Sequence, residues 1–436
     1  METRHIGRMV TGCLSGGVIV ALALVLGPIA GAEEHVITGT ILLTFASSWA
    51  CLGMLSLLRQ QPQRWAFAIA TFMALAGVTL LVFAPGGADI DALGWIWPPL
   101  FLALLAATIV RVRRDLHSRS RRWVVYPLLG IYALAAVGGG YETIREALDR
   151  RIMAPGQLVD VGGHRLHLRC TGSGTPTVLL ESGLGETGAY WEWIAPAVAR
   201  DTKVCVYDRP GRGWSEPVSA PQDGVAVATD LHTLLDRAHV PGPFVLVGHS
   251  SGAQYVRIFA GQYPEQVAGM VLLDGQPAEA FEGLPSYPTF YRVFHRIFAV
   301  LPTLARLGVG RVVVQPYAEL PARAREMQRV HYASARFYLS LRDEFAELPA
   351  SLAEARSFQS LGDRPLVVVS AARDAQAGWL PLQERLAKLS TNSSHRVVPS
   401  THIALVTDQT AAQTSIQAIR DVVRAVRSNA TLAKTL

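Results

Sequence analysis

The uneven distribution of apolar residues constrains the fold of this chain more than any other feature of its sequence. Half of the 436 residues are hydrophobic and 17% are charged, whereas about 25% of the residues in an ordinary soluble domain are charged. The apolar excess is concentrated before residue 141, and the composition after that point is typical of a soluble domain. We therefore expect a membrane-embedded N-terminal part followed by a soluble part.

Five apolar segments can be read in the first 140 residues. They cover residues 9–30, 36–58, 65–83, 93–110 and 123–140. A helix of about 20 residues crosses the hydrocarbon of a bilayer, so each segment is long enough to span it. Pro98 and Pro99 predict a kink in the fourth segment. The sequence thus predicts a transmembrane region of five helices at 1–140 and a short helical connector at 141–155.

The loops between these segments alternate in charge. Arginines precede the first segment and lie in the loops after the second and the fourth, whereas the loops after the first and the third contain acidic residues and no Lys or Arg. By the positive-inside rule, the N-terminus faces the cytoplasm and the soluble part lies outside it. Ala30-Gly31-Ala32 also resembles a signal-peptide cleavage site, but the four remaining spans would leave the soluble part on the same side.

These features predict an integral protein of a bacterial-type plasma membrane with an extracytoplasmic soluble domain. The spans contain almost no ionisable side chains, whereas transporters and proton relays usually need some. We therefore expect the spans to act mainly as an anchor, with a sensing, partner-binding or lipid-access role as the alternative. The net charge of +6 includes no long basic block in the soluble part, so no nucleic-acid partner is expected.

After the connector, the pattern changes to short apolar runs separated by turn residues. A Gly-Gly-His turn at 162–164 separates the first two runs and predicts a hairpin. The predicted strands are 158–161, 165–170, 177–181, 203–207, 244–247, 269–274, 365–370 and 395–398, and helical stretches lie between them at 224–238, 251–262, 379–390 and 408–426. A hairpin followed by alternating strands and helices predicts an α/β fold with a mostly parallel eight-stranded sheet and helices on both faces.

The motif with the clearest chemical meaning is Gly248-His249-Ser250-Ser251-Gly252. It directly follows a predicted strand and directly precedes a predicted helix. A nucleophile on such a sharp turn takes strained backbone angles, and glycines on both sides leave room for it. Ser250 is therefore the candidate nucleophile, and a Gly/Ser-rich loop of no catalytic importance is the alternative interpretation.

Two further segments join this motif in resembling a known family. E-S-G-L-G at 181–185 follows the third predicted strand, and D-R-P-G-R-G-W-S at 208–215 follows the fourth. With the serine motif, and in this order, they resemble the α/β-hydrolase superfamily, in its lidded esterase, lipase and aminopeptidase-like branch. The resemblance covers residues 156–436 and implies the α/β-hydrolase fold. It makes 181–185 the oxyanion loop, with Ser182 where a histidine is common, and 208–215 a mainly structural turn.

The serine needs a histidine base and a carboxylate that orients it. In the family that this chain resembles, the order along the chain is serine, acid, histidine. His402 follows the last predicted strand, where the resemblance places the base. The resemblance places the acid at Asp374, after the seventh strand. Asp274, after the sixth strand, is the alternative because some relatives carry the acid there.

The resemblance also implies a mechanism. Ser250 would attack a carbonyl group, the N–H groups of Leu184 and Ser251 would hold the oxyanion, and water would release an acyl-enzyme. No metal ion and no organic cofactor are needed for these steps. A serine at this position argues against the relatives with an aspartate nucleophile, which are dehalogenases and epoxide hydrolases.

Residues 275–364 exceed what the bare fold needs, and they predict a helical cap over Ser250. Helix-compatible apolar spacing covers 291–307 and 322–345. Aromatic side chains of the cap, such as Phe290 and Tyr291, could line an apolar acyl pocket. The alternative is that they only pack the cap onto the sheet.

Two of the four cysteines, Cys13 and Cys51, fall in expected spans. Cys170 and Cys205 lie in the second and fourth predicted strands, which are neighbours in the fold that this chain resembles. The pair could form a disulfide, which is permitted outside the cytoplasm, or could remain as two buried thiols.

The leading expectation is a membrane-anchored serine hydrolase that cleaves a carboxylic ester, or a related acyl bond, of a small and lipid-like molecule. The rival within the enzymes is a serine aminopeptidase of the proline-iminopeptidase kind. It would need cap carboxylates around the substrate amine, and the available ones are Glu279, Glu282, Glu319 and Glu326. A non-catalytic binding or sensing module on the same fold is the third interpretation.

Overall fold

The computed structural model of the chain describes residues 3–60, 62–115, 119–150, 152 and 155–432. The chain divides into two compact units that do not follow the order of the sequence. The helical unit comprises Met1–Ile152, Val293–Val314 and Ala333–Leu339, and the sheet unit comprises Met153–Arg292, Gln315–Tyr332 and Ser340–Leu436. Two short stretches of the expected cap therefore belong to the compact unit that contains the N-terminal helices.

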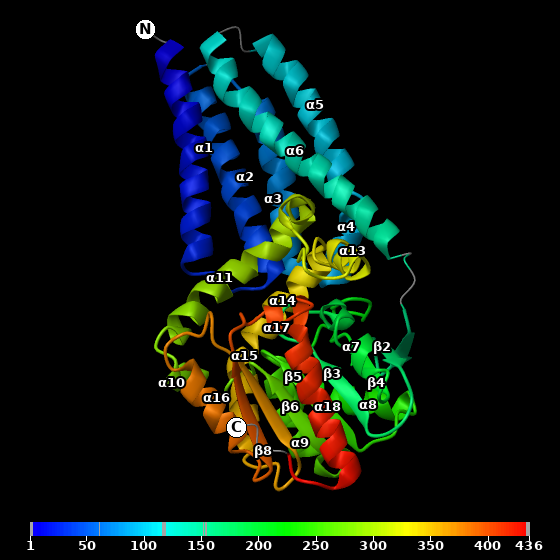
Figure 1. Ribbon diagram of the computed structural model, residues 1–436. Helices are drawn as coiled ribbons and strands as arrows, with labels where there is room; N and C mark the ends of the chain where they lie inside the picture. The colour runs from blue at the N-terminus through cyan, green and yellow to red at the C-terminus, as the bar shows by residue number, and fades with distance from the viewer. Residues whose placement is uncertain (1–2, 61, 116–118, 151, 153–154, 433–436) are drawn as a thin grey trace. The chain divides into compact units, whose positions relative to one another are not determined.

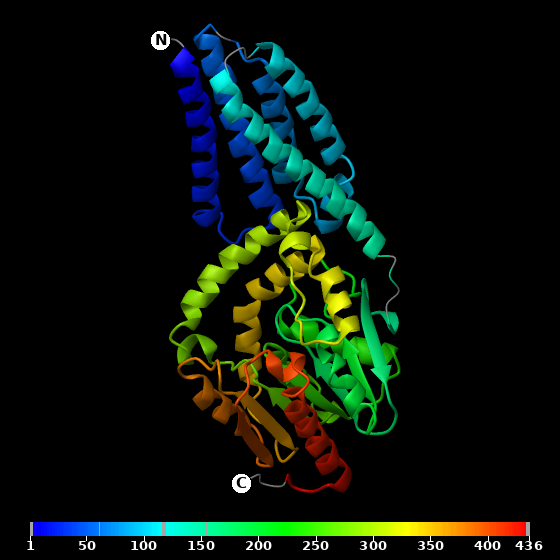
Figure 2. The same ribbon diagram turned by 45° about the horizontal axis from the view of Figure 1, so that its top comes forward.

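The helical unit is built on long helices that lie side by side, α1 beside α2, α2 beside α3, and α5 beside α6 (Figures 1 and 2). Its N-terminal helices are α1 (Thr3–Leu26), α2 (Glu34–Leu58), α3 (Trp65–Phe83), α4 (Gly87–Leu93), α5 (Trp97–Asp115) and α6 (Arg119–Asp149). Trp49 and Trp65 pack edge to face in the centre of this unit, together with Leu105 and Leu129. Their burial gives the unit an apolar core of its own.

The apolar helices differ in part from the five expected spans. By length and composition, α2 and α3 could each cross a membrane, and α4 with α5 could form a third, bent span. The fourth segment is bent by 40°, as expected, but the bend lies at residues 94–96, before Pro98 and Pro99, rather than at the prolines. Both prolines then lie in the first turn of α5, where a missing N–H removes no helical hydrogen bond.

Ion pairs fasten the later segment of the helical unit to its N-terminal helices. This segment holds most of α11 (Tyr287–Arg306) and α12 (Val309–Val313). Arg306 donates to Glu34 and to Asp91, each at 2.5 Å. Glu34 is almost fully buried, so its charge depends on this arginine for compensation.

The sheet unit contains eight strands in the order β1-β2-β4-β3-β5-β6-β7-β8. They are β1 (Gln157–Asp160), β2 (Arg165–Thr171), β3 (Thr177–Glu181), β4 (Val204–Tyr207), β5 (Phe244–His249), β6 (Val267–Leu273), β7 (Leu366–Ala371) and β8 (Ser393–Val398). Strand β2 runs antiparallel to its neighbours β1 and β4, and the remaining pairs are parallel. The expected eight-stranded, mostly parallel sheet is confirmed.

Helices cover both faces of this sheet. One face packs against α8 (Gly224–Arg237), α9 (Gly252–Gln262), α15 (Leu348–Ser357) and α16 (Trp379–Ala387), and the other against η1 (Gly188–Glu192), α7 (Ala195–Val198), α17 (Ala404–Thr407) and α18 (Ala412–Ser428). The remaining elements are η2 (Pro264–Gln266), α10 (Ala280–Gly283), α13 (Ala322–His331) and α14 (Ala335–Ala346). Because β5, β6 and β7 are almost completely buried between the helix layers, they read as mostly continuous apolar runs rather than as alternating ones.

The cap contains one helix more than expected at its C-terminal end. The single helix expected at 322–345 is wrong, since α13 ends at His331 and α14 begins at Ala335. The Ser334 hydroxyl accepts the N–H of Phe337 at 3.3 Å. A serine in this position caps the start of a new helix, which explains the break.

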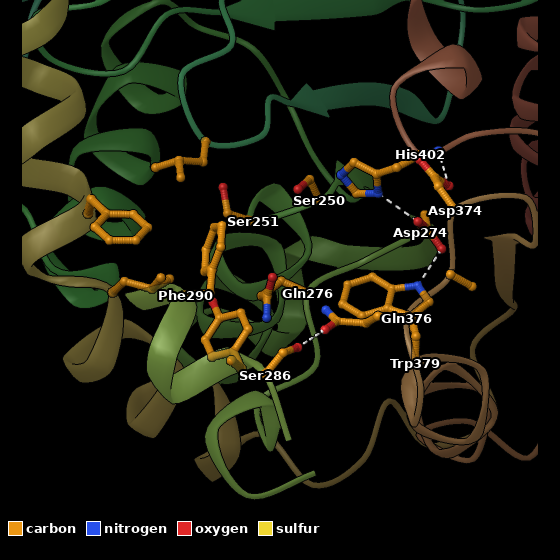
Figure 3. A pocket seen from close by; sticks show the side chains of 15 residues that line it. Ser250, Ser251, Asp274, Gln276, Ser286, Phe290, Asp374, Gln376, Trp379 and His402 are labelled. Atoms are coloured by element: carbon orange, nitrogen blue, oxygen red, sulfur yellow. Dashed lines mark hydrogen bonds and ion pairs between the residues drawn. The ribbon is translucent and has the colours of Figure 1, made fainter. Parts of the chain in front are cut away.

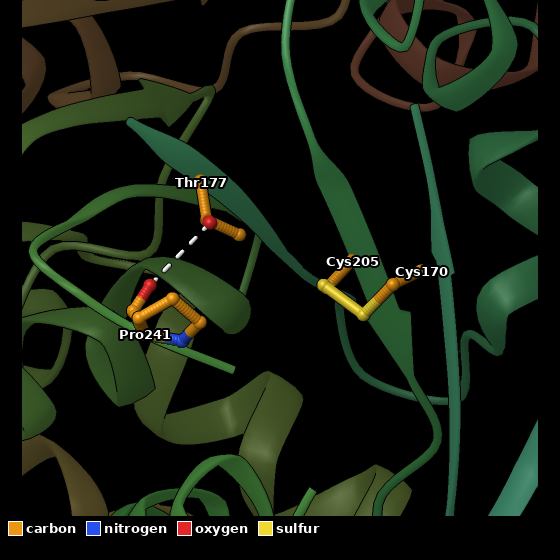
Figure 4. The surroundings of a disulfide bond; sticks show 4 residues. All are labelled: Cys170, Thr177, Cys205 and Pro241. Carbon is orange, nitrogen blue, oxygen red and sulfur yellow. Dashed lines mark hydrogen bonds between the residues drawn. A yellow bond between two sulfur atoms is a disulfide. The ribbon is translucent and has the colours of Figure 1, made fainter. Parts of the chain in front are cut away.

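A disulfide joins Cys170 of β2 to Cys205 of β4 (Figure 4). The two cysteines lie directly opposite each other in the antiparallel register of these strands. Of the two alternatives left open by the sequence, the structure has the bonded one.

Candidate active site

Ser250 lies on a sharp turn between β5 and α9 and has a φ of 53°. This left-handed conformation is rare for a residue other than glycine, and it is held only where the surroundings impose it. A Cβ on Gly248 would lie 2.6 Å from the main-chain carbon of Gly252, and one on Gly252 would collide with the Glu181 carbonyl. Both glycines are thus needed for the turn that presents Ser250.

His402 follows β8, and its ring is paired with Asp274 rather than with Asp374. The distance from Nδ1 of His402 to Oδ2 of Asp274 is 2.6 Å. Oδ1 of Asp274 accepts hydrogen bonds from Nε1 of Trp379 at 2.7 Å and from the N–H of Ala371 at 3.1 Å. The carboxylate of Asp374 instead accepts the main-chain N–H of His402 at 2.9 Å. The expected choice of Asp374 as the acid on the imidazole is therefore corrected to Asp274.

The sheet order gives the physical reason for this correction. Strand β6 pairs with β5 in parallel, and Leu273 lies opposite His249. The residues that follow, Asp274 and Ser250, therefore leave the same edge of the sheet on adjacent strands. Asp374 leaves the neighbouring strand β7 three residues after that strand ends, and this extra length carries it to the main chain of the His402 loop.

Ser250 and His402 both point into one cavity of about 380 Å³ (Figure 3). Asp274 lies behind His402 and is almost fully buried. Residues of the cap form much of the opposite wall, and these are Ser286, Tyr287, Phe290, Phe345 and Leu348. The volume is within the usual range for a small-molecule site.

The two residues expected to form an oxyanion hole, Leu184 and Ser251, line the same cavity as Ser250. The turn that carries Leu184 is held by buried Arg209, which donates to the carbonyls of Ser182 at 2.6 Å and of Gly183 at 2.7 Å. A Cβ on Gly183 would lie 2.9 Å from Cβ of Ser250. A glycine is therefore required for the close approach of this turn to the serine.

The turn at 208–215 is a buried structural element beside this site. Asp208 accepts hydrogen bonds from Nδ1 of His167 and from the N–H of Gly188, each at 2.8 Å. Burial alone would raise the pKa of Asp208, but the bond and the charge of His167 outweigh it and lower the pKa to about 2. The Ser215 hydroxyl closes the turn onto the Asp208 carbonyl at 2.5 Å, in agreement with a structural role.

A buried pair that the sequence did not reveal lies directly beside His402. Nδ1 of His249 is 2.7 Å from Oε1 of Glu186, and Nε2 of His249 is 3.1 Å from the His402 carbonyl. Burial disfavours the charged ring, but the Glu186 carboxylate outweighs that effect and raises the pKa of His249. A glutamate just after the oxyanion loop was the one available signal for this pair.

Comparison with known proteins identifies the family. Residues 176–409 match the family described as alpha/beta hydrolase fold, which is more than half of the chain. This chain belongs to the α/β-hydrolase family. The sequence is 29% identical over 291 residues to an uncharacterized protein of Schizosaccharomyces pombe, a match that covers 58% of this chain and 53% of the relative.

Two further relatives extend this comparison. An uncharacterized vacuolar membrane protein of Saccharomyces cerevisiae is 33% identical over 103 residues, which is 23% of this α/β-hydrolase chain and 16% of the relative. The chain thus spans about half the length, or less, of these curated relatives. A solved structure from Pseudomonas aeruginosa, named for an epoxide hydrolase, has a TM-score of 0.51 at 20% identity and covers 62% of this chain and 96% of its own. At that identity the likeness shows the fold alone.

Proposed function

We propose that the sheet unit is a serine hydrolase that cleaves a carboxylic ester or a related acyl bond. The observation that carries this proposal is the arrangement around one cavity. A serine on a strained strand-to-helix turn and a histidine paired with a buried carboxylate both open onto it. Nucleophile, base and orienting acid are the three parts that activate a serine.

In the proposed mechanism, the Asp274 carboxylate accepts the Nδ1–H of His402 and so leaves Nε2 free to take the hydroxyl proton of Ser250. The Ser250 oxygen bonds to the carbonyl carbon of the ester, and the N–H groups of Leu184 and Ser251 stabilise the oxyanion by about 3–4 kcal/mol per donor. His402 then returns its proton to the leaving alkoxide. Water, deprotonated by His402, attacks the acyl-enzyme and releases the acid and Ser250.

The residue at the nucleophile position distinguishes the proposed ester hydrolysis from the epoxide hydrolysis for which one structural relative is named. Epoxide hydrolases and dehalogenases of this fold resemble one another in using an aspartate at that position, whereas this chain has Ser250. A serine supports acyl transfer, in which the nucleophile adds to a carbonyl carbon and the collapsing oxyanion expels an alcohol.

The lining of the cavity favours a neutral substrate with an apolar acyl group. The rings of Tyr287, Phe290 and Phe345 and the side chain of Leu348 supply apolar surface. Nε2 of Gln276 is buried at the cavity without a hydrogen-bond partner, and it could donate to a second oxygen of the substrate.

The aminopeptidase alternative is less well supported. None of the four cap glutamates proposed for it is among the described residues that line the cavity, whose only carboxylates are Asp274 and Asp374. Glu282 instead pairs with Arg356 at 2.7 Å. A substrate ammonium group would find no spare carboxylate there to compensate its charge.

We also propose that the N-terminal part crosses a plasma membrane five times, with the N-terminus in the cytoplasm and the hydrolase outside. The support is the arginine content of alternate loops, the two to three helices that are apolar and long enough to span, and the membrane-protein name of a yeast relative. Tethering at a membrane suits a lipid-like ester, which concentrates in the bilayer.

Labelling with a fluorophosphonate tests the proposal, because this probe reacts with activated serines. Membranes that contain the wild-type protein should show a labelled band at its mass, and membranes with Ser250→Ala at equal abundance should not. Unlabelled wild-type protein should then hydrolyse neutral acyl esters faster than amino-acid amides. Folded wild-type protein that takes up no label would overturn the serine-hydrolase proposal and favour a non-catalytic module.

A further inference from the structure

The Glu186–His249 pair connects three of the four loops that carry the proposed catalytic groups. Glu186 follows β3 and accepts the N–H of Gly183, in the oxyanion loop, at 2.6 Å. His249 is the residue before Ser250. Its ring reaches the loop after β8, where it contacts the His402 carbonyl. One pair of side chains thus touches the oxyanion loop, the nucleophile turn and the base loop.

The hydrogen-bond partners of this pair determine where its protons lie. A carbonyl oxygen can only accept, so Nε2 of His249 must carry a proton and donate it to His402. Nδ1 then shares one further proton with Oε1 of Glu186. Burial raises the pKa of the Glu186 carboxyl, but His249 outweighs this effect and the net pKa is lowered, while the pKa of His249 is raised. The shared proton therefore resides on the ring, and the pair is an imidazolium and a carboxylate.

Burial makes this arrangement costly to disturb. The side chain of His249 is 0% exposed and that of Glu186 is 5% exposed. Removing one member of a buried ion pair leaves the other charge uncompensated, whereas an intact and fully hydrogen-bonded pair holds its neighbours rigidly. The ring centroids of His249 and His402 are 4.7 Å apart, so a shift of the His249 ring would displace the His402 ring.

We propose that Glu186 and His249 are a positioning pair, which fixes the positions of the His402 base and of the oxyanion loop relative to Ser250. The proposal rests on the proposed serine-hydrolase function. Neither residue is assigned a proton transfer to the substrate, since both lie outside the cavity lining. Their effect is to hold the main chain of His402 and of Gly183 at fixed distances from the same rigid turn, which is what transition-state alignment requires.

The charges around the pair define its pH dependence. The ionisable groups that face it are the ring of His402, Asp274 behind that ring, and three tyrosines at the Glu186 side, which are Tyr190, Tyr317 and Tyr332. The pKa of each tyrosine is raised by burial, so they stay neutral where an esterase is assayed. His249 is therefore the group of the pair whose ionisation changes on the alkaline side.

The sign of this dependence follows from the direction of the pKa shifts. Because the folded-state pKa of His249 is raised, the stabilisation from the pair is complete below the unfolded pKa of about 6.5 and is lost as the pH rises through the folded value. Turnover should therefore fall as the pH rises through this range, because the contact of His249 with His402 loosens. For Glu186, whose pKa is lowered, the stabilisation is lost only as the pH falls through its folded value.

The test uses the full chain in detergent, with Glu186→Gln as the main variant. The concentration of active sites in each preparation is found by titrating an aliquot with a fluorophosphonate. On the untreated remainder, kcat and KM for a chromogenic ester are measured per titrated site across the pH range. We expect kcat to fall about 10- to 100-fold, the size of effect that follows a small misalignment, with KM little changed. The alkaline fall in turnover should also move to lower pH, since the amide cannot hold the imidazolium.

Two matched variants separate positioning from general stabilisation. His249→Asn keeps a donor toward Glu186 but loses the contact with His402, and we expect it to lower kcat in the same way. His167→Gln removes a buried histidine–carboxylate pair of similar geometry and should lower the melting temperature while leaving kcat per site and the pH profile unchanged.

The outcomes distinguish the two levels of inference. Wild-type kcat and an unchanged pH profile in titratable Glu186→Gln would overturn the positioning role while leaving the serine hydrolase intact. If Glu186→Gln does not fold, His249→Asn decides between the same two results. Folded wild-type protein that cannot be titrated would instead overturn the proposed function, and the positioning role with it.

Discussion

Replacing Asp274 by asparagine should nearly abolish turnover, and the structure explains why. Trp379 and Ala371 both donate to Oδ1 of Asp274, so the amide oxygen of an asparagine would remain in that place. Its NH₂ group would then replace Oδ2 opposite Nδ1 of His402. Since an NH₂ group only donates, Nδ1 must accept, and the single ring proton is moved to Nε2, where it blocks uptake of the Ser250 proton.

The loss of turnover expected for Asp274→Asn can be compared with the loss expected for the matched substitution Asp374→Asn. Fixing the wrong tautomer lowers kcat about 10⁴-fold in a Ser-His-Asp enzyme, which corresponds to about 5 kcal/mol of barrier. In Asp374→Asn, the amide oxygen can still accept the main-chain N–H of His402, so only the charge of one hydrogen bond is lost. That loss is about 1 kcal/mol, or less than about 10-fold in rate.

The assay compares kcat of both variants with wild type on a chromogenic ester at neutral pH, at equal folded concentration measured by near-UV circular dichroism. We expect Asp274→Asn to retain the wild-type fold and substrate affinity while its turnover approaches that of Ser250→Ala. A large loss in Asp374→Asn, together with near-wild-type turnover in Asp274→Asn, would refute the reasoning and return the acid to Asp374.

Three further substitutions test the structure around the site. Asp208→Asn should remove about 2 kcal/mol of stability at neutral pH, because the pKa of Asp208 is lowered to about 2 in the folded protein. The stabilisation is present above the pKa of the unfolded carboxyl and is lost as the pH falls from about 4 to 2. Denaturant unfolding at both ends of that range measures it. Replacing Cys170 and Cys205 together by alanine should cost about 3–4 kcal/mol for a loop closed over 35 residues, seen as a lower melting temperature. Arg306→Met leaves the carboxylate of Glu34 buried without its partner and should destabilise the helical unit by about 3–5 kcal/mol, which limited proteolysis in detergent would detect.

The sheet could be predicted from the sequence because its signals are local. Buried runs such as Phe244–His249 are continuous stretches of apolar residues bounded by turn residues, and their order along the chain fixes a hairpin followed by parallel strands. The serine turn was also readable, since a glycine on each side of Ser250 is a local pattern, although the contact that requires Gly252 is with distant Glu181. His402 followed from the family resemblance and its place after the last strand.

What could not be predicted depends on contacts between distant segments. Two aspartates follow strand ends, and only the register of β6 against β5 decides that Asp274 meets the imidazole. The partner of His249 is 63 residues away in sequence, and the only sign of it was a glutamate just after the oxyanion loop. The break between α13 and α14 depends on a serine cap, and it was missed from the sequence because the apolar spacing of a helix continues through the break.

Four histidine–carboxylate pairs lie among the described residues of the sheet unit, and exposure separates the roles of the three that lie at or beside the candidate site. In the pairs His167–Asp208 and His249–Glu186, the histidine side chain is 4% and 0% exposed, whereas His402, paired with Asp274, is 33% exposed. A base must exchange its proton with a substrate and with water, so a sealed imidazole cannot serve, however well a carboxylate orients it. A sealed pair can only contribute through the geometry that it imposes on its neighbours. Among the histidines that the structure pairs with these three carboxylates, His402 alone meets the requirement for a base.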